Sequence, residues 1–278
     1  MRFYLDDLPL DVEVPPAVKF LKGKNECLSR LSGDPALDCA WYERGYSISS
    51  FEHLLSHKKL LVTLEDVVKR KLKDIFPAKS LNGFTLENYH QFVSEDEHKM
   101  AADPVLKRLY LKDLPGIADV FVKFISQILS TEMDFKRRQG DDSEHWIILR
   151  LNPPHSFAYN PPHKDIYEDI DINGFCPRMI NAWIPIAGVS CLAGLGLAPK
   201  SHLLLESDIV RTRAGAQMNN RNFSVNMIKS WGGSNKLLNI YPSEGQILCF
   251  SSHLVHGLGI NKSPSTTRVA LEFRLHKQ

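Results

Sequence analysis

The chain has 278 residues, of which 43% are hydrophobic and 24% charged, and its formal net charge is +2. This composition is typical of an ordinary globular protein that forms one large domain or two small ones. So small a net charge argues against nucleic acid or an anionic membrane as the main partner. No apolar run approaches the ~20 residues that span a bilayer. Acidic residues near the start argue against an export signal, and five scattered cysteines without a Cys-x-x-Cys pair indicate free thiols in the cytoplasm.

The first half of the chain, residues 1–140, has the periodicity of amphipathic helices. Apolar residues recur at helical spacing from Leu60 to Phe76, and Thr63 is the expected N-cap. Two further helices are expected to begin at Asp103 and at Pro115, because proline is favoured in the first helical turn. No glycine-rich phosphate loop follows a strand here, so a nucleotide-binding fold has no support. We therefore predict that this half is mostly helical scaffold.

From residue 141 onward the pattern changes to short strands broken by Pro, Gly and Asn. The clearest strands are His145–Asn152, Met179–Ile186, Gln246–Phe250 and Arg268–Arg274. Strands with one apolar face under helices and one polar face lining a cavity are typical of a double-sheet jelly roll. A parallel α/β sheet would instead show continuous apolar strands. We predict a mainly β fold with helical support (α+β): a single domain in which a jelly-roll core over residues 141–278 carries the N-terminal helices.

One connection, residues 205–236, is long for a link between strands. It is polar and basic, with Arg211 and Arg213 among its cations. Long insertions in compact domains are typically lids or binding loops. Its cations are compatible with an anionic small-molecule substrate, and a solvated surface is the alternative interpretation.

An imidazole and a carboxylate stand two positions apart at His163 and Asp165. In an extended strand these residues share a face, so they can converge on one metal ion while Lys164 points away. His256 follows a predicted strand and precedes glycines that permit close backbone approach, which makes it the candidate third ligand. His253 follows the same strand and competes for that role. Two histidines and one carboxylate leave coordination positions open, which suits non-heme Fe(II) in oxygenase chemistry.

A cation is expected in the same cavity. Arg268 starts the last strand, and a buried arginine needs an anionic partner because an unpaired buried charge is unfavourable. A dicarboxylate co-substrate would provide one through two parallel hydrogen bonds. Arg274 shares this strand face and is the alternative. Arg150 and Asn152 also face the predicted cavity, either to contact the co-substrate or substrate or to form a structural salt bridge.

The order of these motifs resembles the phytanoyl-CoA dioxygenase group of Fe(II)- and 2-oxoglutarate-dependent oxygenases. The resemblance covers roughly Trp146 to the C-terminus, and the first half matches only as generic helical support. The shared series is His163-Lys164-Asp165, Trp183, the turn from Gly194 to His202, Gly245-Gln246, His256-Gly257 and Arg268. It implies that His163, Asp165 and His256 bind iron. It also implies that Arg268 holds the far carboxylate of 2-oxoglutarate.

Three positions depart from the family pattern. They are Lys200 in place of the glycine of a Pro-Gly-Ser-His turn, Gln246 in place of the aspartate of a Gly-Asp pair, and Ala270 in place of a hydroxyl residue two positions after the arginine. Thr266 and Thr267 are the candidate sources of that hydroxyl. Trp183 either lines the pocket or packs within it, and His202 is either a turn residue or a substrate contact.

The resemblance implies an enzyme that takes Fe(II), 2-oxoglutarate and O2, with ascorbate as a supporting reductant. Its expected reaction is hydroxylation of an unactivated C–H bond of a metabolite or natural product, with release of succinate and CO2. Because Asp165 is present rather than Gly or Ala, halogenation is not expected, whereas desaturation or ring closure depends on substrate placement. A cupin-type metalloenzyme without 2-oxoglutarate and a non-catalytic jelly-roll binding protein are the alternatives. The candidate substrate contacts are Asn152, His202, Arg211 and Arg213. The sequence specifies neither the substrate nor the oligomeric state.

Overall fold

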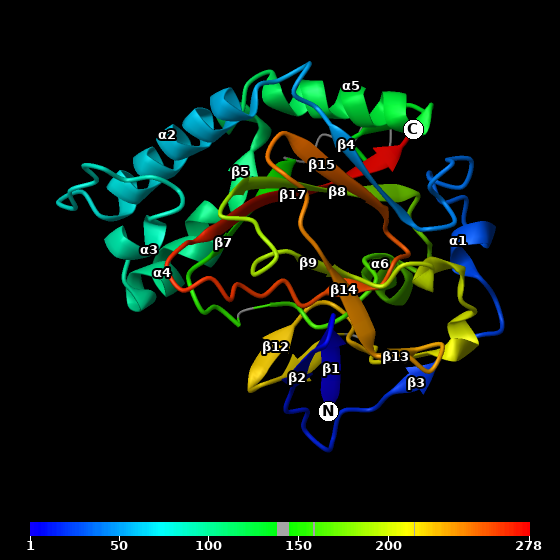
Figure 1. Ribbon diagram of the computed structural model, residues 1–278. Coiled ribbons are helices and arrows are strands. Elements are labelled where there is room, and N and C mark those ends of the chain that lie inside the picture. Colours follow the sequence, from blue (N-terminus) through cyan, green and yellow to red (C-terminus); the bar gives the residue numbers. More distant parts are fainter. Residues whose placement is uncertain (138–144, 158, 214) are drawn as a thin grey trace.

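A computed structural model describes residues 1–137, 145–157, 159–213 and 215–278 of the chain, and its core consists of two mostly antiparallel sheets facing each other (Figure 1). The predicted boundary between residues 140 and 141 lies outside the described residues. The large sheet runs in the order β4 (Tyr46–Ser50), β15 (Gln246–Ser251), β8 (Met179–Ala187), β17 (Arg268–Lys277), β7 (Trp146–Asn152) and β5 (Arg108–Tyr110), with β6 (Met133–Asp134) also paired to β17. The small sheet runs in the order β16 (His256–Gly257), β9 (Leu195–Leu197), β14 (Lys236–Ile240), β1 (Arg2–Leu5) and β2 (Leu8–Asp11).

The second half of the chain winds back and forth between these sheets. Strands β7, β8, β15 and β17 belong to the large sheet. Between them the chain crosses to the small sheet at an isolated bridge at His163, then at β9 with β14, and again at β16. This alternation is the jelly-roll arrangement, so the fold class expected from the period-two pattern is confirmed.

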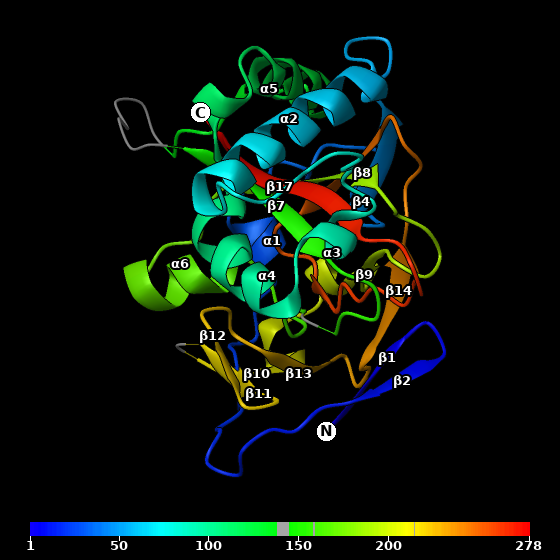
Figure 2. The same ribbon diagram turned by 90° about the vertical axis from the view of Figure 1, so that its left-hand side faces the viewer.

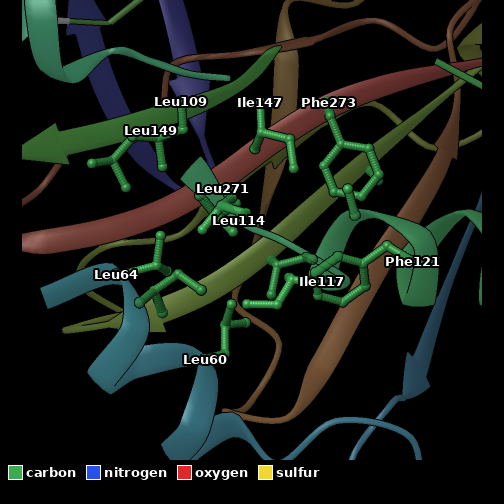
Figure 3. Packing of buried hydrophobic residues seen from close by; sticks show 14 of the residues in the cluster. Leu60, Leu64, Leu109, Leu114, Ile117, Phe121, Ile147, Leu149, Leu271 and Phe273 are labelled. Atoms are coloured by element: carbon green, nitrogen blue, oxygen red, sulfur yellow. The ribbon is translucent and has the colours of Figure 1, made fainter. Parts of the chain in front are cut away.

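Two long helices cover the outer face of the large sheet, α2 (His57–Ile75) and α5 (Ile117–Leu129) (Figures 1 and 2). In Figure 3, Leu60 of α2 and Phe121 of α5 lie among side chains of the sheet such as Ile147, Leu271 and Phe273. All five are buried, and each such side chain stabilises the fold by about 1.5–3 kcal/mol. Because side chains alternate along a strand, this packing leaves the opposite face of the sheet free for polar residues.

Shorter elements complete the structure. The remaining helices are α1 (Leu28–Leu31), α3 (Tyr89–Phe92), α4 (Glu95–Ala101) and α6 (Ile166–Asn173), with 3-10 turns at Leu111–Asp113, Ser201–Leu203 and Glu206–Asp208. A separate three-stranded sheet, outside the two core sheets, consists of β13 (Ile228–Trp231), β10 (Ile209–Arg211) and β3 (Leu21–Lys22). Strand β11 (Ala216–Met218) pairs with β12 (Arg221–Phe223). The long connection is therefore largely built of short strands. None of the helices in the described part of the chain has the length and apolar character needed to cross a membrane.

Two helix starts were predicted wrongly. Helix α2 begins at His57, so Thr63 lies inside the helix and donates its hydroxyl proton to the carbonyl of Lys59, 2.9 Å away. The buried side of the helix starts at His57 itself, a turn before the apolar pattern shows it. At Asp103 the backbone forms a π-helical turn that continues α4, and it then enters β5. The helix expected after Pro115 is confirmed as α5.

The N-terminal half also contributes strands that the sequence pattern did not predict. Strand β1 pairs in parallel with β14, and β4 pairs along its length with β15. These strands extend both sheets of the core at their edges. The first half of the chain is therefore part of the jelly roll as well as its helical support.

Candidate metal centre

The three predicted metal ligands converge on one point. His163 Nε2 lies 3.4 Å from Asp165 Oδ1, and His256 Nε2 lies 3.6 Å from Asp165 Oδ2. The backbone brings the histidines together, because the amide of each donates to the carbonyl of the other over 2.9 and 3.0 Å. All three residues are buried, and their ligand atoms lie within 4.8 Å of one another. Within the described residues, this is the group of histidine, cysteine or acidic side chains that could hold a metal ion.

Hydrogen bonds fix the tautomers of the two histidines. Nδ1 of His163 lies 2.7 Å from the carbonyl oxygen of Pro161, and Nδ1 of His256 lies 3.1 Å from that of Leu254. A carbonyl oxygen only accepts, so each Nδ1 carries a proton and each Nε2 keeps a free lone pair on the Asp165 side. Burial lowers the pKa of His256 to about 4, which keeps that ring neutral. Metal-binding histidines usually make such a hydrogen bond with the ring nitrogen that does not bind the metal.

Asp165 is held as a carboxylate by two donors. A guanidinium nitrogen of Arg274 lies 2.6 Å from Oδ1, and the side-chain amide of Asn181 donates to Oδ2 over 2.7 Å. Burial alone would raise the pKa of Asp165, but the charge of Arg274, together with the contacts of His256 and His163, outweighs burial and holds that pKa well below its usual value. An ionised carboxylate beside two neutral imidazoles fits a divalent cation that accepts both nitrogen and oxygen ligands.

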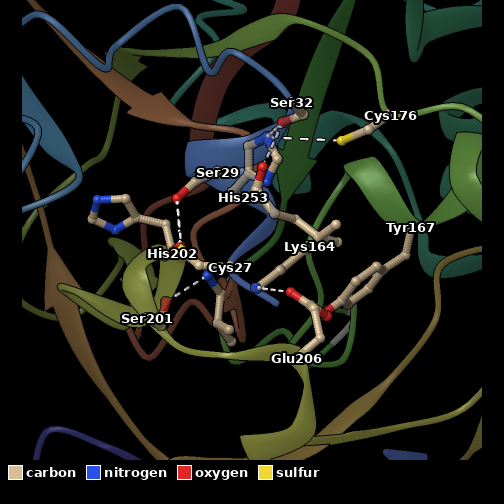
Figure 4. A network of polar contacts seen from close by, with 12 residues as sticks. Cys27, Ser29, Ser32, Lys164, Tyr167, Cys176, Ser201, His202, Glu206 and His253 are labelled. Atoms are coloured by element: carbon tan, nitrogen blue, oxygen red, sulfur yellow. Dashed lines mark hydrogen bonds and ion pairs between the residues drawn. The ribbon is translucent and has the colours of Figure 1, made fainter. Parts of the chain in front are cut away.

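Lys164, between the two ligands, points away from them into a second polar cluster (Figure 4). We call it the buried ion network; its members are Lys164, Tyr167, Asp171, Glu206, Arg211 and Asn226. Lys164 Nζ lies 2.9 Å from Glu206 Oε1, and the hydroxyl of Tyr167 donates to Glu206 Oε2 over 2.5 Å. The sequence predicted only that Lys164 points away from the metal ligands, and the structure pairs it with Glu206.

The other half of this network involves Arg211. Its guanidinium donates to both oxygens of Asp171, at 2.8 and 3.0 Å, and stacks 3.8 Å from the centre of the Tyr167 ring. The side-chain amide of Asn226 donates to Asp171 as well. The charges of the network are therefore matched within it.

A cavity of about 1400 Å³ opens over the polar face of the large sheet and includes the triad. Its floor consists of alternate side chains of three strands of the large sheet. Arg268, Glu272 and Arg274 come from β17, Arg150 and Asn152 from β7, and Asn181 and Trp183 from β8. A space of this size exceeds the volume usual for one small ligand, roughly 300–1,000 Å³, and can hold two.

Arg268 lies at one end of this floor and is almost fully buried. Its two terminal nitrogens donate to the carbonyl of Gly194 and to Asn152 Oδ1, both over 2.6 Å, while its Nε has no hydrogen-bond partner. Among the described residues no carboxylate oxygen lies within 4 Å of its guanidinium. Burial lowers the pKa of Arg268 to about 10, so it remains charged at neutral pH. Such a cation fits an anionic ligand.

Other predicted cavity residues also lie there. Arg150 Nε donates to Glu272 Oε2 over 2.7 Å, so it forms the salt bridge that was one of its two expected roles and lines the cavity as well. Trp183 is fully buried, and its ring centre lies 5.7 Å from the central carbon of the Arg268 guanidinium. Asn152 contacts Arg268 directly.

Four predicted contacts are absent from the described lining of the cavity: Thr266, His202, Arg211 and Arg213. Arg211 belongs to the buried ion network, and Arg213 is half exposed beside Asp171. The ring of His202 lies 2.6 Å from the carbonyl of Tyr42, deep under α1. Thr267 is absent from that lining too, and its hydroxyl lies 2.9 Å from Nδ1 of His90.

His253, the competing ligand, lies outside the triad. Its Nε2 is 3.2 Å from the hydroxyl of Ser32 and 3.9 Å from the thiol of Cys176 (Figure 4). Sequence reasoning also underrated two residues that hold Asp165. The sequence suggested Arg274 only as an alternative to Arg268, and it suggested no role for Asn181. Their shared face with Trp183 and Arg268 was the available signal.

No family model matches the sequence, and no curated protein matches it. Similar solved structures include AviO1 from Streptomyces viridochromogenes Tue57, at 15% identity over 92% of this chain and 96% of that chain, with a TM-score of 0.49. EctD from S. alaskensis is 15% identical over 96% and 85% of the two chains, with a TM-score of 0.47. At such low similarity, a functional assignment has to come from the geometry of the chain itself.

Proposed function

We propose that the protein is a dioxygenase dependent on Fe(II) and 2-oxoglutarate. The observation that supports this most is the presence of two complementary groups in one cavity. One is the buried donor set of His163, Asp165 and His256, and the other is Arg268, which has no carboxylate partner among the described residues. A structural zinc site would be closed by four protein ligands, whereas three ligands leave positions open for substrates.

In this proposal His163, His256 and Asp165 hold the iron, and Arg268 holds the distal carboxylate of 2-oxoglutarate. The bound iron supplies the oxidative chemistry with O2, in which 2-oxoglutarate becomes succinate and CO2 and a substrate C–H bond is hydroxylated. The paired Nδ1 contacts orient the histidine lone pairs, and Arg274 with Asn181 fixes the carboxylate plane. Ascorbate would serve as a supporting reductant.

The residues present favour hydroxylation of a small molecule. Asp165 occupies the third ligand position, so halide binding there is not expected. Desaturation or ring closure would depend on how the substrate is placed. We further propose that residues 1–278 act as one oxygenase unit in which the 205–236 segment contributes to the wall of the cavity, since Arg221 to Ser224 line it. The five free cysteines support a cytoplasmic location.

Two alternatives are disfavoured by particular observations. A cupin-type metalloenzyme without 2-oxoglutarate accounts for the triad but gives no reason for a buried cation at Arg268. A non-catalytic binding protein gives no reason for histidine lone pairs that are oriented onto a carboxylate.

The proposal is tested by adding Fe(II) and 2-oxoglutarate to the protein without oxygen. We expect a visible charge-transfer band, and succinate when air is admitted. In Arg268→Gln the affinity for 2-oxoglutarate should fall about 10- to 100-fold, the worth of a charged hydrogen bond, with Fe(II) affinity unchanged. Arg213→Gln removes the same charge outside the cavity and should behave as wild type. Absence of both band and succinate, or an unchanged affinity in Arg268→Gln, contradicts the proposal.

A further inference from the structure

Arg274 is the cation nearest the triad, and most of its donors are uncommitted. One terminal nitrogen donates to Asp165 Oδ1, while the side chain remains 37% exposed and lines the cavity. An arginine has five N–H donors, and among the contacts of the described residues this carboxylate is its hydrogen-bond acceptor. Several of its N–H groups can therefore donate to a ligand that lies in the cavity.

The charges of the floor are not balanced. On the strand floor Arg150, Arg268 and Arg274 outnumber Asp165 and Glu272, and the rest of the described lining adds Lys99, Lys107, Arg137 and Arg221 against Glu95, so cations are in excess. In the proposed enzyme a divalent metal ion and doubly charged 2-oxoglutarate cancel each other. The excess of positive charge then persists beside the bound metal, where a low dielectric strengthens its attraction for an anion.

The partners of the three arginines indicate which of them carries this excess. Arg150 keeps Glu272, and Arg268 would receive 2-oxoglutarate. Arg274 has one hydrogen-bonded carboxylate, Asp165, whose charge a metal ion would share, while the charges of Glu168 and Glu272 act on it without a hydrogen bond. Metal binding therefore weakens the hydrogen-bonded charge that holds Arg274 and leaves its guanidinium available.

Building on the proposed function, we propose that Arg274 binds a carboxylate of the primary substrate once a metal ion has taken up the charge of Asp165. The substrate would be an anion, because cations are in excess in the lining of the cavity. Its reacting carbon would lie next to the carboxylate-bearing end, since Arg274 contacts the metal ligand itself. Arg274 thus replaces Arg211 and Arg213 as the residue expected to bind an anionic substrate, because Arg211 donates to Asp171 and Arg213 lies outside the described lining of the cavity.

The test uses metal-free protein, so that its result does not depend on iron or 2-oxoglutarate. Asp165→Asn removes the charge of the carboxylate but keeps its shape and an oxygen that can accept from Arg274. Trifluoroacetate serves as the carboxylate probe, and its binding is followed by broadening of its ¹⁹F NMR signal. We expect Asp165→Asn to bind the probe about tenfold more tightly than wild type or better, and added NaCl to reduce the difference.

Double variants assign the effect to one arginine. Asp165→Asn with Arg274→Gln should return to the wild-type affinity, whereas Asp165→Asn with Arg213→Gln, the charge-matched control, should keep the gain. The gain should also survive Arg268→Gln. Arg274→Lys, which keeps the charge but not the fork of donors, should give an intermediate affinity and serves if the glutamine variant fails to fold. A gain that persists without Arg274, or no gain in Asp165→Asn, overturns the proposal.

Discussion

Two buried polar regions that differ in kind meet at three consecutive residues of the chain. His163 and Asp165 face the cavity, whereas Lys164 between them enters the buried ion network. In the network each charged group meets an opposite charge or a donor within the fold. In the triad, three hydrogen-bond acceptors converge on one another. Arg268 nearby is a cation with no carboxylate oxygen of the described residues within 4 Å of its guanidinium. A region whose charges are matched internally contributes to folding, whereas one that leaves acceptors convergent and a cation unmatched is suited to binding.

The largest expected effect is on the triad. His256→Ala removes a metal ligand and should weaken Fe(II) or Co(II) affinity by more than about 100-fold, since even outer contacts of a ligand are worth 10–100-fold. Succinate formation should fall below detection. The unfolding midpoint of the metal-free protein should change little, because the triad contributes little to folding. Calorimetric metal titration with thermal unfolding measures both; a large loss of metal-free stability would remove the contrast between the two regions.

The network should respond in the opposite way. Lys164→Met leaves Glu206 buried without its cation, which should destabilise the protein by about 3–5 kcal/mol and lower the unfolding midpoint by roughly 10 °C. Metal affinity of the folded protein should remain within about twofold of wild type. Adding Glu206→Gln should recover part of the stability. If Lys164→Met weakens metal binding as strongly as it weakens folding, the two regions are one unit.

A buried carboxylate without a nearby cation provides a reference for Asp165. Burial raises the pKa of Asp34 to about 6, despite hydrogen bonds from Ser251 and from the amide of Ala36 that lower it. The folded state therefore holds this proton more tightly than the unfolded state. The stability it contributes is fully present below the unfolded pKa of 3.8 and is lost as pH rises through about 6.

The Asp34→Asn variant should lack this loss. Across that pH range, wild type should lose about 3 kcal/mol relative to the variant, since each pKa unit is worth about 1.4 kcal/mol. This corresponds to a difference of about 6 °C in the unfolding midpoint. Thermal unfolding at pH 4 and pH 7 measures it. Equal slopes for the two proteins would show that Asp34 does not hold its proton.

The smallest changes in metal affinity and stability are expected for two asparagines that make the same kind of contact. Asn181 donates to Asp165 in the triad, and Asn226 donates to Asp171 in the network, over 2.7 and 2.8 Å. Asn181→Ala should weaken metal affinity by about tenfold with little change in stability. Asn226→Ala should lower stability by about 1–3 kcal/mol and leave metal affinity unchanged. Metal titration and denaturant unfolding of both variants would show whether the distinction holds at single contacts.

The sequence allowed much of the core to be predicted, because period-two alternation sets which side of a strand is buried. Arg268, Glu272 and Arg274 share the cavity face as expected from alternation alone, while Leu271 and Phe273 pack under the helices. The same rule predicted that His163 and Asp165 converge, although the structure has no strand there: His163 forms an isolated bridge and Asp165 is the N-cap of α6. These features depend on neighbours in the chain.

Features that depend on distant partners were not predictable in this way. Lys164 finds Glu206 42 positions later, and the short strand β1 finds β14 at the other end of the chain. The assignment of Arg211 to the substrate failed for this reason, since its partner Asp171 lies on another element. Local pattern shows that a residue is polar but does not reveal which opposite charge the fold brings to it.

The origin of the network partners restricts how this protein could be re-engineered. Glu206, Arg211 and Asn226 all come from the 205–236 segment. Exchanging that whole segment to alter selectivity would strip Lys164 and Asp171 of their partners and unfold the chain for reasons unrelated to chemistry. The exchangeable unit is instead the four-residue stretch Arg221 to Ser224, which lines the cavity and supplies no member of the network.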